Sequence, residues 1–345
     1  MVEQAPPEVP PSYRLLRMVT SLWVPQTIYA AAELGVADVL GDAALRSEDV
    51  AKAIGADAGA VYRLLRALVA LGLATQDGAG AFALTAVGAC LRADSPTSLR
   101  SWALLMGGPR CWEGWGRLAD CVRSGETAPR LLHGMGTFEL MKANPREFAL
   151  FDTAMVELTR RVSGALAAAY DFSGMRRVVD VGGGLGALLP EVLRANPTLH
   201  GVVFDQPHCR EGARRHFDAA GLGDRYEFVG GDFFESVPPG ADAYLVKSVI
   251  HDWDDARCLE ILARCRAAMT PEARLLVLEV PFPERVSSEV QHGMNVFSDL
   301  NMLVMAGGRE RTEAEYRDLL ETGGFRVSRI VPTASAYCVI EARVA

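Results

Sequence analysis

Three side chains in the C-terminal half of the chain have the types that general-base chemistry requires. His251 follows an apolar run, Glu279 ends the next one, and Glu310 lies in a glycine-rich stretch. An imidazole accepts a proton near neutral pH, and a neighbouring carboxylate orients the ring and stabilises its charged form. A single histidine is more often structural, and Glu310 would equally suit the first turn of a helix capped by Thr312. The two glutamates favour a catalytic role for this histidine.

A glycine-rich stretch, VVDVGGGLG at residues 178–186, follows an apolar run and precedes a helical pattern. Glycines in this position let the backbone approach a ligand closely and leave helix-end N–H groups free to bind it. The spacing differs from the G-x-G-x-x-G of dinucleotide sites, and Asp180 would repel a pyrophosphate but attract a cationic amino-acid group. Asp180, Gly182 and Gly184 are therefore expected to bind a cofactor that carries an amino-acid moiety.

Carboxylates also follow the next two apolar runs. Asp205 suits the two hydroxyls of a ribose, while Gly231, Asp232 and Phe233 offer a carboxylate for an adenine amino group and a ring to stack on it. Each residue alone is ordinary, since an aspartate at the end of a strand is more often a helix cap. In this order along the chain, they predict a binding site for S-adenosylmethionine.

The elements that must position these residues alternate between strand-like apolar runs and helical patterns from residue 176 onward. Such alternation predicts a mostly parallel, doubly wound, Rossmann-like α/β sheet, whose ligands bind at the carboxyl ends of the strands. The expected strands are 177–181, 201–204, 226–229, 243–250, 274–280, 325–331 and 336–343, and the expected helices start near residues 185, 209, 255 and 312.

The N-terminal part is organised differently. Helical patterns cover residues 13–39, and a helix, a turn, a second helix and two short apolar runs between residues 47 and 85 have the order of a winged helix. DNA binding is disfavoured, because only Arg63 and Arg66 lie on the would-be recognition helix and acidic residues outnumber basic ones across 40–90. We therefore expect a packing or dimerisation module.

Composition narrows the remaining function classes. The 345 residues include 35 Lys plus Arg against 43 Asp plus Glu, a formal charge of −8, which argues against nucleic acid or a membrane surface as a partner. The seven cysteines form no CxxC pair or zinc-like cluster, so we expect no metal and a reducing, cytoplasmic setting. We find no apolar run long enough for a membrane span and no signal-peptide pattern.

The motifs VDVGGGLG, FDQPH, GDFF, HDWDD and GGRERT together closely resemble those of the plant caffeate/flavonoid-type O-methyltransferase family, in particular its bacterial members. The resemblance covers nearly the whole chain. It implies a class I methyltransferase domain over residues 171–345, preceded by a winged-helix dimerisation domain over 1–100 and a mostly helical linker over 101–170 that contributes to the substrate pocket. It also implies S-adenosylmethionine as the cofactor and a homodimer.

The same resemblance implies roles for individual residues. His251 would be the general base that removes a proton from a hydroxyl, with Glu279 and Glu310 holding its ring. The residues that it implies as cofactor contacts are Gly182, Asp205, Asp232, Phe233 and Lys247.

The acceptor is expected to be a small aromatic molecule that binds beside the cofactor. Phe148, Phe151 and Met155 recur at helical spacing, which is more often a core stripe but here immediately precedes the cofactor domain. Further candidates for contacts with the acceptor are Asp252, Asn295, Phe297 and Asp299.

Other functions stay open beside O-methylation of a phenolic or other hydroxylated aromatic molecule in secondary metabolism. A few members of this family catalyse hydroxylation, decarboxylation or ring formation with the same cofactor, and the intact set of His251, Glu279 and Glu310 argues against these reactions. The glycine spacing and Asp180 disfavour a nicotinamide-dependent dehydrogenase. The acidic balance disfavours a winged-helix regulator.

Overall fold

The structure is a computed structural model that describes residues 9–287 and 290–345. The chain divides into two compact units, Met1–Trp112 and Glu113–Ala345. The division falls inside the helical segment that the sequence assigns to residues 101–170. Among the residues described, no helix is long and apolar enough to cross a membrane.

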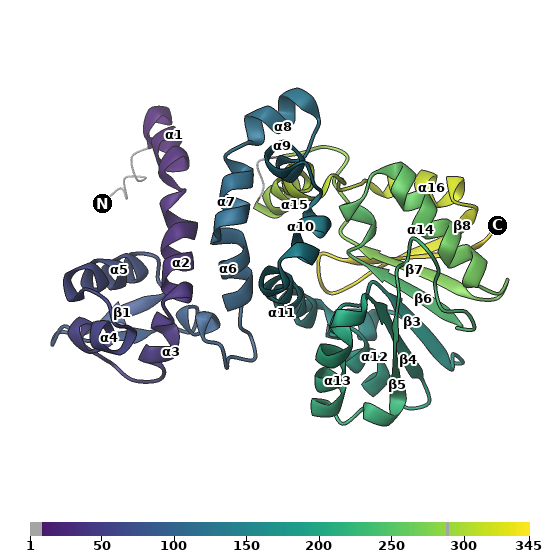
Figure 1. The fold of residues 1–345 in the computed structure, drawn as a ribbon, viewed down its shortest axis with the longest axis horizontal. Helices are drawn as coiled ribbons and strands as arrows, with labels where there is room; N and C mark the ends of the chain where they lie inside the picture. The colour runs from purple at the N-terminus through teal and green to yellow at the C-terminus, as the bar shows by residue number, and fades with distance from the viewer. Residues whose placement is uncertain (1–8, 288–289) are drawn as a thin grey trace, which may run out of the picture. The chain divides into compact units, whose positions relative to one another are not determined.

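The first unit combines helices with a two-stranded wing (Figure 1). Its elements, with α7 crossing into the second unit, are α1 (Pro11–Thr20), α2 (Trp23–Glu33), α3 (Val36–Leu40), α4 (Ser47–Ile54), α5 (Ala58–Ala70), β1 (Ala74–Gln76), β2 (Phe82–Leu84), η1 (Gly88–Leu91), α6 (Arg100–Gly107) and α7 (Pro109–Trp115). The antiparallel pair β1–β2 follows α4 and α5, which is the winged-helix order expected from the sequence. Val50, Leu65 and Phe82 are fully buried and join the helices to the wing.

Helix α1 has no buried residue. Apolar side chains along α1 and the start of α2 are instead exposed, with exposed fractions between 48% at Leu22 and 65% at Trp23. We call this surface the α1 face; it comprises Tyr13, Leu15, Leu16, Met18, Val19, Leu22 and Trp23. A contiguous apolar surface of this kind marks a site of protein association.

The second unit is built on a seven-stranded sheet of order β5-β4-β3-β6-β7-β9-β8. Its strands are β3 (Arg177–Val181), β4 (His200–Asp205), β5 (Tyr226–Gly230), β6 (Ala243–Lys247), β7 (Arg274–Glu279), β8 (Phe325–Pro332) and β9 (Cys338–Val344). The first five run parallel, and β9 pairs antiparallel with both β7 and β8. The strand order reverses between β3 and β6, which is where open α/β sheets bind ligands.

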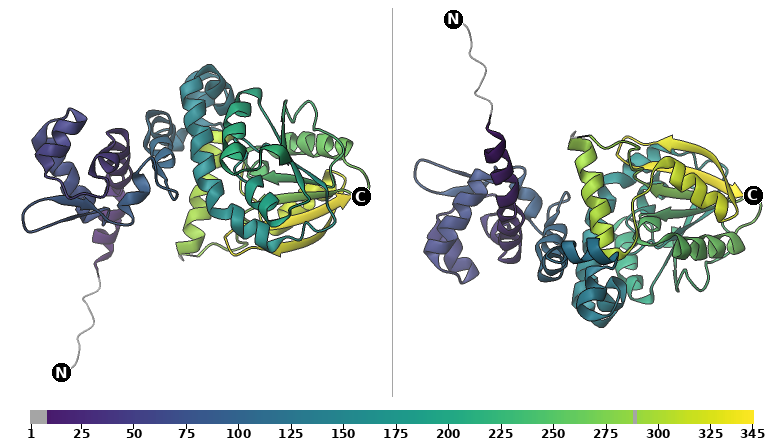
Figure 2. Two further views of the ribbon diagram at one scale, coloured as in Figure 1. Left: turned by 90° about the horizontal axis from the view of Figure 1, so that it is seen from below. Right: turned by 90° about the horizontal axis from the view of Figure 1, so that it is seen from above.

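Helices cover both faces of this sheet (Figures 1 and 2). The helices that pack on the sheet are α11 (Pro145–Ala169), α12 (Leu189–Ala195), α13 (Arg210–Ala219), α14 (Asp255–Ala268) and α16 (Glu313–Thr322). The unit also contains α8 (Leu118–Ser124), α9 (Ala128–His133), α10 (Thr137–Ala143) and α15 (Val290–Asn301), and the short turns η2 (Pro207–Cys209), η3 (Gly223–Arg225), η4 (Ile250–Asp252) and η5 (Met302–Ala306). Alternate strand residues enter two separate cores: Val178 packs with α12 and α13, and Val179 packs with α14 and α16.

Two features differ from the expectation. The strand expected to run to Ile250 ends at Lys247, because Ser248 adopts a left-handed conformation with φ of 53° that a strand cannot continue through. Helix α15 and the π-helical turn η5 are not among the elements that the sequence predicts, although Asn295, Phe297 and Asp299 on α15 are expected acceptor contacts.

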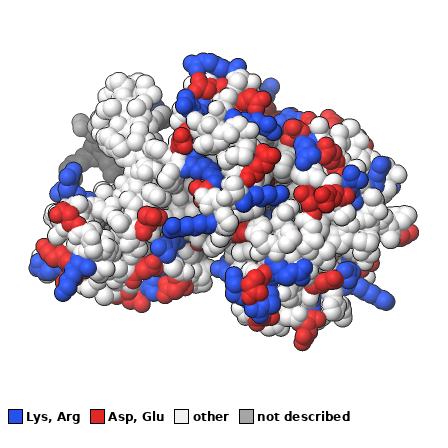
Figure 3. Space-filling view, viewed as in Figure 1, with Lys and Arg blue, Asp and Glu red and all other residues white. Residues whose placement is uncertain are grey.

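Charged side chains of both signs are interspersed on the face shown in Figure 3. Among the described residues visible there, Lys and Arg lie beside Asp and Glu on both units. A protein that binds nucleic acid without sequence preference presents basic side chains together along one surface, and this face has no such surface.

Candidate functional site

His251 and Glu279 meet at the carboxyl ends of two neighbouring parallel strands. Strands β6 and β7 pair with Lys247 opposite Leu278, so the residues that follow lie side by side. The Nδ1 atom of His251 lies 2.8 Å from Oε2 of Glu279, and 18% of the histidine side chain but none of the glutamate is exposed. The imidazole is thus held by one nitrogen against a buried carboxylate.

Glu310 reaches the same ring from the turn that precedes α16. Its Oε2 lies 3.8 Å from Nδ1 of His251. Helix α15 holds this glutamate twice: Ser298 donates a hydrogen bond of 2.7 Å to Oε1, and the backbone N–H of Glu310 donates one of 2.9 Å to Asp299. Asp299, a candidate acceptor contact, therefore bonds to the Glu310 backbone, and Ser298 was not identified from the sequence.

Carboxyl groups govern the protonation of His251. Burial lowers the pKa of the imidazole, but the charge and contact of Glu279, with smaller effects of Asp252 and Glu310, outweigh burial and raise this pKa to about 10. Burial raises the pKa of Asp252 to about 6, although the nearby imidazole opposes the rise. Burial also raises the pKa of the Glu310 carboxyl.

A strained turn connects strand β6 to the histidine. Ser248 has a φ of 53°, and a non-glycine residue in this region costs about 1–3 kcal/mol that the surrounding structure must supply. Its backbone N–H donates to the carbonyl of Leu278 at 3.1 Å, and its hydroxyl lies 2.9 Å from that of Tyr337. These bonds keep the turn against β7 and direct the chain toward His251.

The glycine loop after β3 packs against this turn. A Cβ atom on Gly182 would lie 2.8 Å from Cγ2 of Val249, two residues before His251. Gly182 and Gly184 have φ values of 73° and 55°, which favour glycine. The N–H of Gly184 donates a hydrogen bond of 2.7 Å to Asp205. The sheet therefore brings the expected cofactor loop next to the histidine.

Asp180 is the acidic residue of strand β3 that lies two positions before this loop. It is buried, and its Oδ2 atom has no hydrogen-bond partner among the described residues. Burial raises its pKa to about 7, while Lys247 opposes the rise and Asp205 adds to it. A buried acceptor without a donor fits the amino group of S-adenosylmethionine, which would supply both the missing hydrogen bond and a positive charge.

The residues expected to bind the ribose and the adenine of the cofactor lie at the ends of β4 and β5. Asp205 accepts backbone N–H groups from Gly184 and from Gln206. Asp232 accepts the N–H of Phe234 at 2.9 Å, and Phe233 lies beside the glycine loop, 3.6 Å from where a Gly182 Cβ would be. The pieces of the expected cofactor site thus lie at successive strand ends.

Gly231 and Lys247 are the two remaining residues that are expected to contact the cofactor. A Cβ on Gly231 would lie 2.5 Å from the ring of Phe204, so no larger residue fits there without a shift. Lys247 donates a hydrogen bond of 3.2 Å to Thr159 on α11, and its Nζ lies 5.2 Å from the ring centre of Tyr337. The lysine side chain thus joins the sheet to α11.

The apolar stripe on α11 divides between two environments. The ring of Phe148 lies 4.2 Å from the ring of His208, beside the ribose end of the site. Phe151 instead meets Phe138 edge-on at 6.2 Å, and Phe138 stacks on Trp253 at 5.3 Å with an angle of 21° between the rings. Phe138 and Trp253 were not identified as contacts from the sequence, although Trp253 lies in the HDW motif.

The remaining candidate contacts differ in how closely they approach His251. Asp252 Oδ1 lies 3.7 Å from Nε2 of His251. Asn295 donates a hydrogen bond of 3.5 Å to the carbonyl of Pro281, and Phe297 leaves 63% of its surface exposed. Met155 is partly buried on α11. Of this group, Asp252 is the one in direct contact with the imidazole.

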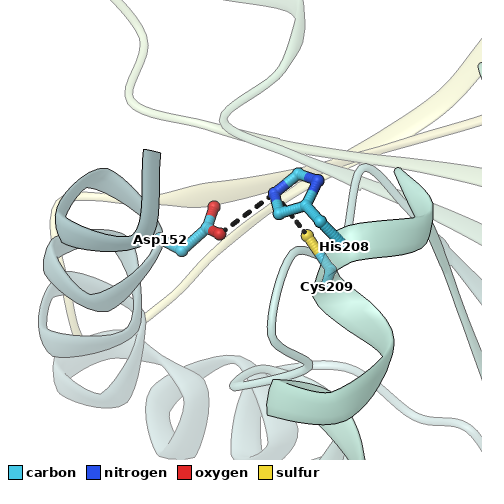
Figure 4. A group of neighbouring side chains, drawn as sticks. All are labelled: Asp152, His208 and Cys209. Carbon is cyan, nitrogen blue, oxygen red and sulfur yellow. Dashed lines mark hydrogen bonds and ion pairs between the residues drawn. The ribbon is translucent and has the colours of Figure 1, made fainter. Parts of the chain in front are cut away.

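A second polar cluster, not indicated by the sequence, joins α11 to the loop after β4. Figure 4 shows the Asp152 carboxylate directed at the His208 ring, with the Cys209 sulfur beside it. The Nε2 atom of His208 lies 3.1 Å from Oδ2 of Asp152 and 3.4 Å from Sγ of Cys209. Burial raises the pKa of Asp152 to about 6, and the effect of burial is larger than the opposing effect of His208.

Cys209 is the third member of this cluster. Burial, reinforced by Asp205 and Asp152, raises the pKa of the thiol far above its usual range. The hydrogen bonds of this cluster connect α11 to the loop that carries Asp205.

Comparison with known proteins identifies the family. The O-methyltransferase dimerisation domain matches residues 16–94, and the O-methyltransferase domain matches residues 115–326. The phenazine O-methyltransferase of Lysobacter antibioticus is 40% identical over 335 residues, which cover 97% of each chain. The phenazine-1-carboxylate N-methyltransferase of Pseudomonas aeruginosa is 33% identical, with 92% of each chain covered.

A solved structure adds the cofactor. An O-methyltransferase from neocarzinostatin biosynthesis, in complex with S-adenosylmethionine and 2-hydroxy-5-methyl naphthoic acid, has a TM-score of 0.81 and 35% identity, covering 96% of this chain and 98% of that chain. The fold and cofactor expected from the sequence are thereby confirmed. The chain belongs to the O-methyltransferase family, as an S-adenosylmethionine-dependent enzyme with an N-terminal dimerisation domain.

Proposed function

We propose that this enzyme methylates a phenolic hydroxyl of a small aromatic molecule of secondary metabolism, with His251 as the general base. The observation that carries the proposal is the buried contact of 2.8 Å between Nδ1 of His251 and Glu279, beside the glycine loop. Holding the ring by Nδ1 directs Nε2 away from Glu279, where it can accept a proton from the acceptor.

The proton transfer is nearly balanced in free energy once the imidazole is in its neutral form, because the two groups have similar acidity. A phenol has a pKa of about 10, close to that of tyrosine, and the carboxyl groups around His251 raise the pKa of the imidazole to about 10. Bound S-adenosylmethionine supplies a methyl group already activated on a sulfonium, whose positive charge lowers the pKa of a nearby imidazole. His251 takes the hydroxyl proton as the oxygen–methyl bond forms and the sulfur–methyl bond breaks.

The surrounding residues position the reacting groups. Asp180, Gly182, Gly184 and Lys247 would hold the amino-acid end of the cofactor, and Asp205 its ribose. Gly231, Asp232 and Phe233 would hold its adenine. In-line displacement depends on close approach of the two reactants, so positioning supplies much of the acceleration. No step in this scheme requires a metal ion.

The acceptor would bind on the α11 side of His251. The row formed by Phe151, Phe138 and Trp253 offers aromatic surface that begins two residues after the base. Asp252 would contact the acceptor hydroxyl, and Met155 and Asn295 would complete the wall, with Phe148 closer to the cofactor. Phe297 and Asp299 would act at the edge of this region, from α15.

N-methylation is the second candidate, because a relative carries that activity in its name. An amine attacks with a free lone pair, whereas a phenol must lose its proton to become a strong nucleophile. The three carboxyl groups that strengthen the His251 base therefore favour a hydroxyl acceptor. We expect phenols, and not anilines with the same ring, to give methylated products detectable by mass spectrometry. Methylation of the anilines alone would replace this proposal with N-methylation.

His251→Ala should lower turnover by roughly 10²–10⁴-fold, because the acceptor oxygen loses the group that takes its proton. Cofactor affinity, measured by isothermal titration with S-adenosylhomocysteine, should stay within about two-fold, since the side chain contacts the acceptor. His200→Ala is the matched control, because His200 lies at the opposite, amino end of strand β4. A fully active His251→Ala enzyme would remove the general-base role.

The rate should depend on pH through the imidazole of His251. Only its neutral form accepts a proton, so kcat/KM rises as pH increases through its pKa. Since Glu279 raises this pKa, Glu279→Gln should move the rising limb to lower pH and also reduce the maximal rate, because the ring is less well oriented. Glu313→Gln, on the exposed first turn of α16, should leave the profile in place. An unmoved limb in Glu279→Gln would contradict the assignment.

The dimerisation domain supports a homodimer, and the α1 face is the surface that a second copy would cover. We expect light scattering to give twice the chain mass of 37.2 kDa for the native protein. Leu15→Glu with Val19→Glu places two charges in this apolar face and should yield monomers. Val87→Glu, with a similar exposed fraction of 63% in the same unit, should stay dimeric. A dimeric double variant would place the interface elsewhere.

A further inference from the structure

Arg311 is the largest side chain that is fully buried in the described structure. A guanidinium stays charged in proteins, and burying a charge is costly unless it is paired and hydrogen-bonded. The residue follows directly after Glu310, so it lies within the region that holds His251. The hydrogen bonds of its guanidinium show which parts of this region the buried charge connects.

The guanidinium binds the backbone on both sides of His251. NH1 donates a hydrogen bond of 2.9 Å to the carbonyl of Ile250, and NH2 donates one of 3.0 Å to the carbonyl of Trp253. The turn η4 between these carbonyls is only three residues long. The thiol of Cys258 also donates to these two carbonyls, at 3.2 Å to Ile250 and 3.5 Å to Trp253, so the guanidinium adds charged donors to both ends of the turn.

The charge of Arg311 is compensated by Asp255, at the start of α14. Nε and NH2 of the arginine lie 3.1 and 2.6 Å from Oδ1 of this carboxylate. The backbone carbonyl of Arg311 also accepts a hydrogen bond of 2.7 Å from the N–H of Phe282, three residues after Glu279. One residue thus joins the histidine turn, helix α14 and the segment that leaves β7.

Glycine packing shows that this arrangement leaves little freedom. A Cβ atom on Gly308 would lie 2.1 Å from the carbonyl oxygen of His251, so the segment that precedes Glu310 packs directly against the histidine turn. The histidine turn is therefore held by close packing against Gly308 and by the hydrogen bonds of Arg311.

We propose that Arg311 is a positioning residue for the reaction, which fixes the backbone of His251 so that its imidazole meets Glu279 and Glu310. The proposal rests on the proposed role of His251 as the base. A misplacement of about 1 Å can cost roughly 10²-fold in rate, which is the scale that the loss of these bonds would produce. Lysine cannot replace this function, because a single ammonium lacks the planar set of donors that reaches two carbonyls and a carboxylate.

The chain contains a matched control. Arg309 binds the same Asp255, with NH2 lying 3.1 Å from Oδ2, and also pairs with Glu315. Its side chain is 45% exposed, and none of its hydrogen bonds in the described structure reaches the histidine turn. Arg309→Met therefore removes an ion pair to Asp255 without removing the bonds to Ile250 and Trp253.

The test compares Arg311→Lys with Arg309→Met in kcat, KM, affinity for S-adenosylhomocysteine and the NMR titration of the His251 imidazole, assigned by its loss in His251→Ala. We expect Arg311→Lys to lower kcat at least ten-fold with cofactor affinity within two-fold, and to move the imidazole titration to lower pH, because the ring moves away from Glu279. Arg309→Met should change each quantity less than two-fold.

A folded Arg311→Lys protein with unchanged kcat and an unchanged imidazole titration would overturn the proposal. If this variant does not fold, Asp255→Asn decides the question, because it removes the charge that orients the guanidinium; it should move the imidazole titration in the same direction, and an unmoved titration would overturn the proposal. The titration needs no turnover. A fully active His251→Ala enzyme would therefore refute the base role, while the titration still reports on positioning.

Discussion

The imidazole of His251 is surrounded by three carboxyl groups in a region largely removed from water. Taking ions out of water is costly, and their mutual attraction offsets this cost only while the geometry is kept. Glu279 is fully buried and Glu310 nearly so, with an exposed fraction of 6%. A small displacement would take the imidazole away from buried oxygens of Glu279 and Glu310 that have no hydrogen-bond partner among the described residues. The elements around His251 must therefore fix its position.

The sheet provides the first part of this constraint. Because both faces of the central strands are buried, a slip of one residue would exchange the two cores, so the register of β3, β6 and β7 is fixed. That register places the glycine loop, the histidine turn and Glu279 at three adjacent strand ends. The distance between the glycine loop and His251 is thus set by one hydrogen-bonded ladder. The side chains that hold Glu310 then complete the arrangement from α15.

The residues that sequence reasoning identified are those whose position follows from the strand pattern. His251, Glu279, Asp180 and Asp205 each lie at or just beyond the end of an apolar run, and a parallel sheet collects such residues at one edge. Ser298 and Arg311 act through contacts with distant residues that no local pattern encodes. Helix α15 was not expected, although apolar residues recur in its sequence at helical spacing, at Met294, Phe297 and Leu300. Phe148 and Phe151 share a helical stripe and contact each other at 6.4 Å between ring centres, but Phe148 also packs on His208 and Phe151 on Phe138.

The choice between oxygen and nitrogen as the methyl acceptor is not decided by the fold. Relatives with O- and N-methyltransferase names both match nearly the whole chain, so the shared architecture supports either reaction. What distinguishes a phenol is the proton that it must lose, and a base positioned beside the hydroxyl takes that proton in the transition state. The carboxyl groups around His251 bring its pKa close to that of a phenol. The proposed hydroxyl acceptor therefore rests on the carboxyl groups around His251 at the ends of β6 and β7, which lie near the aromatic row from Phe151 to Trp253.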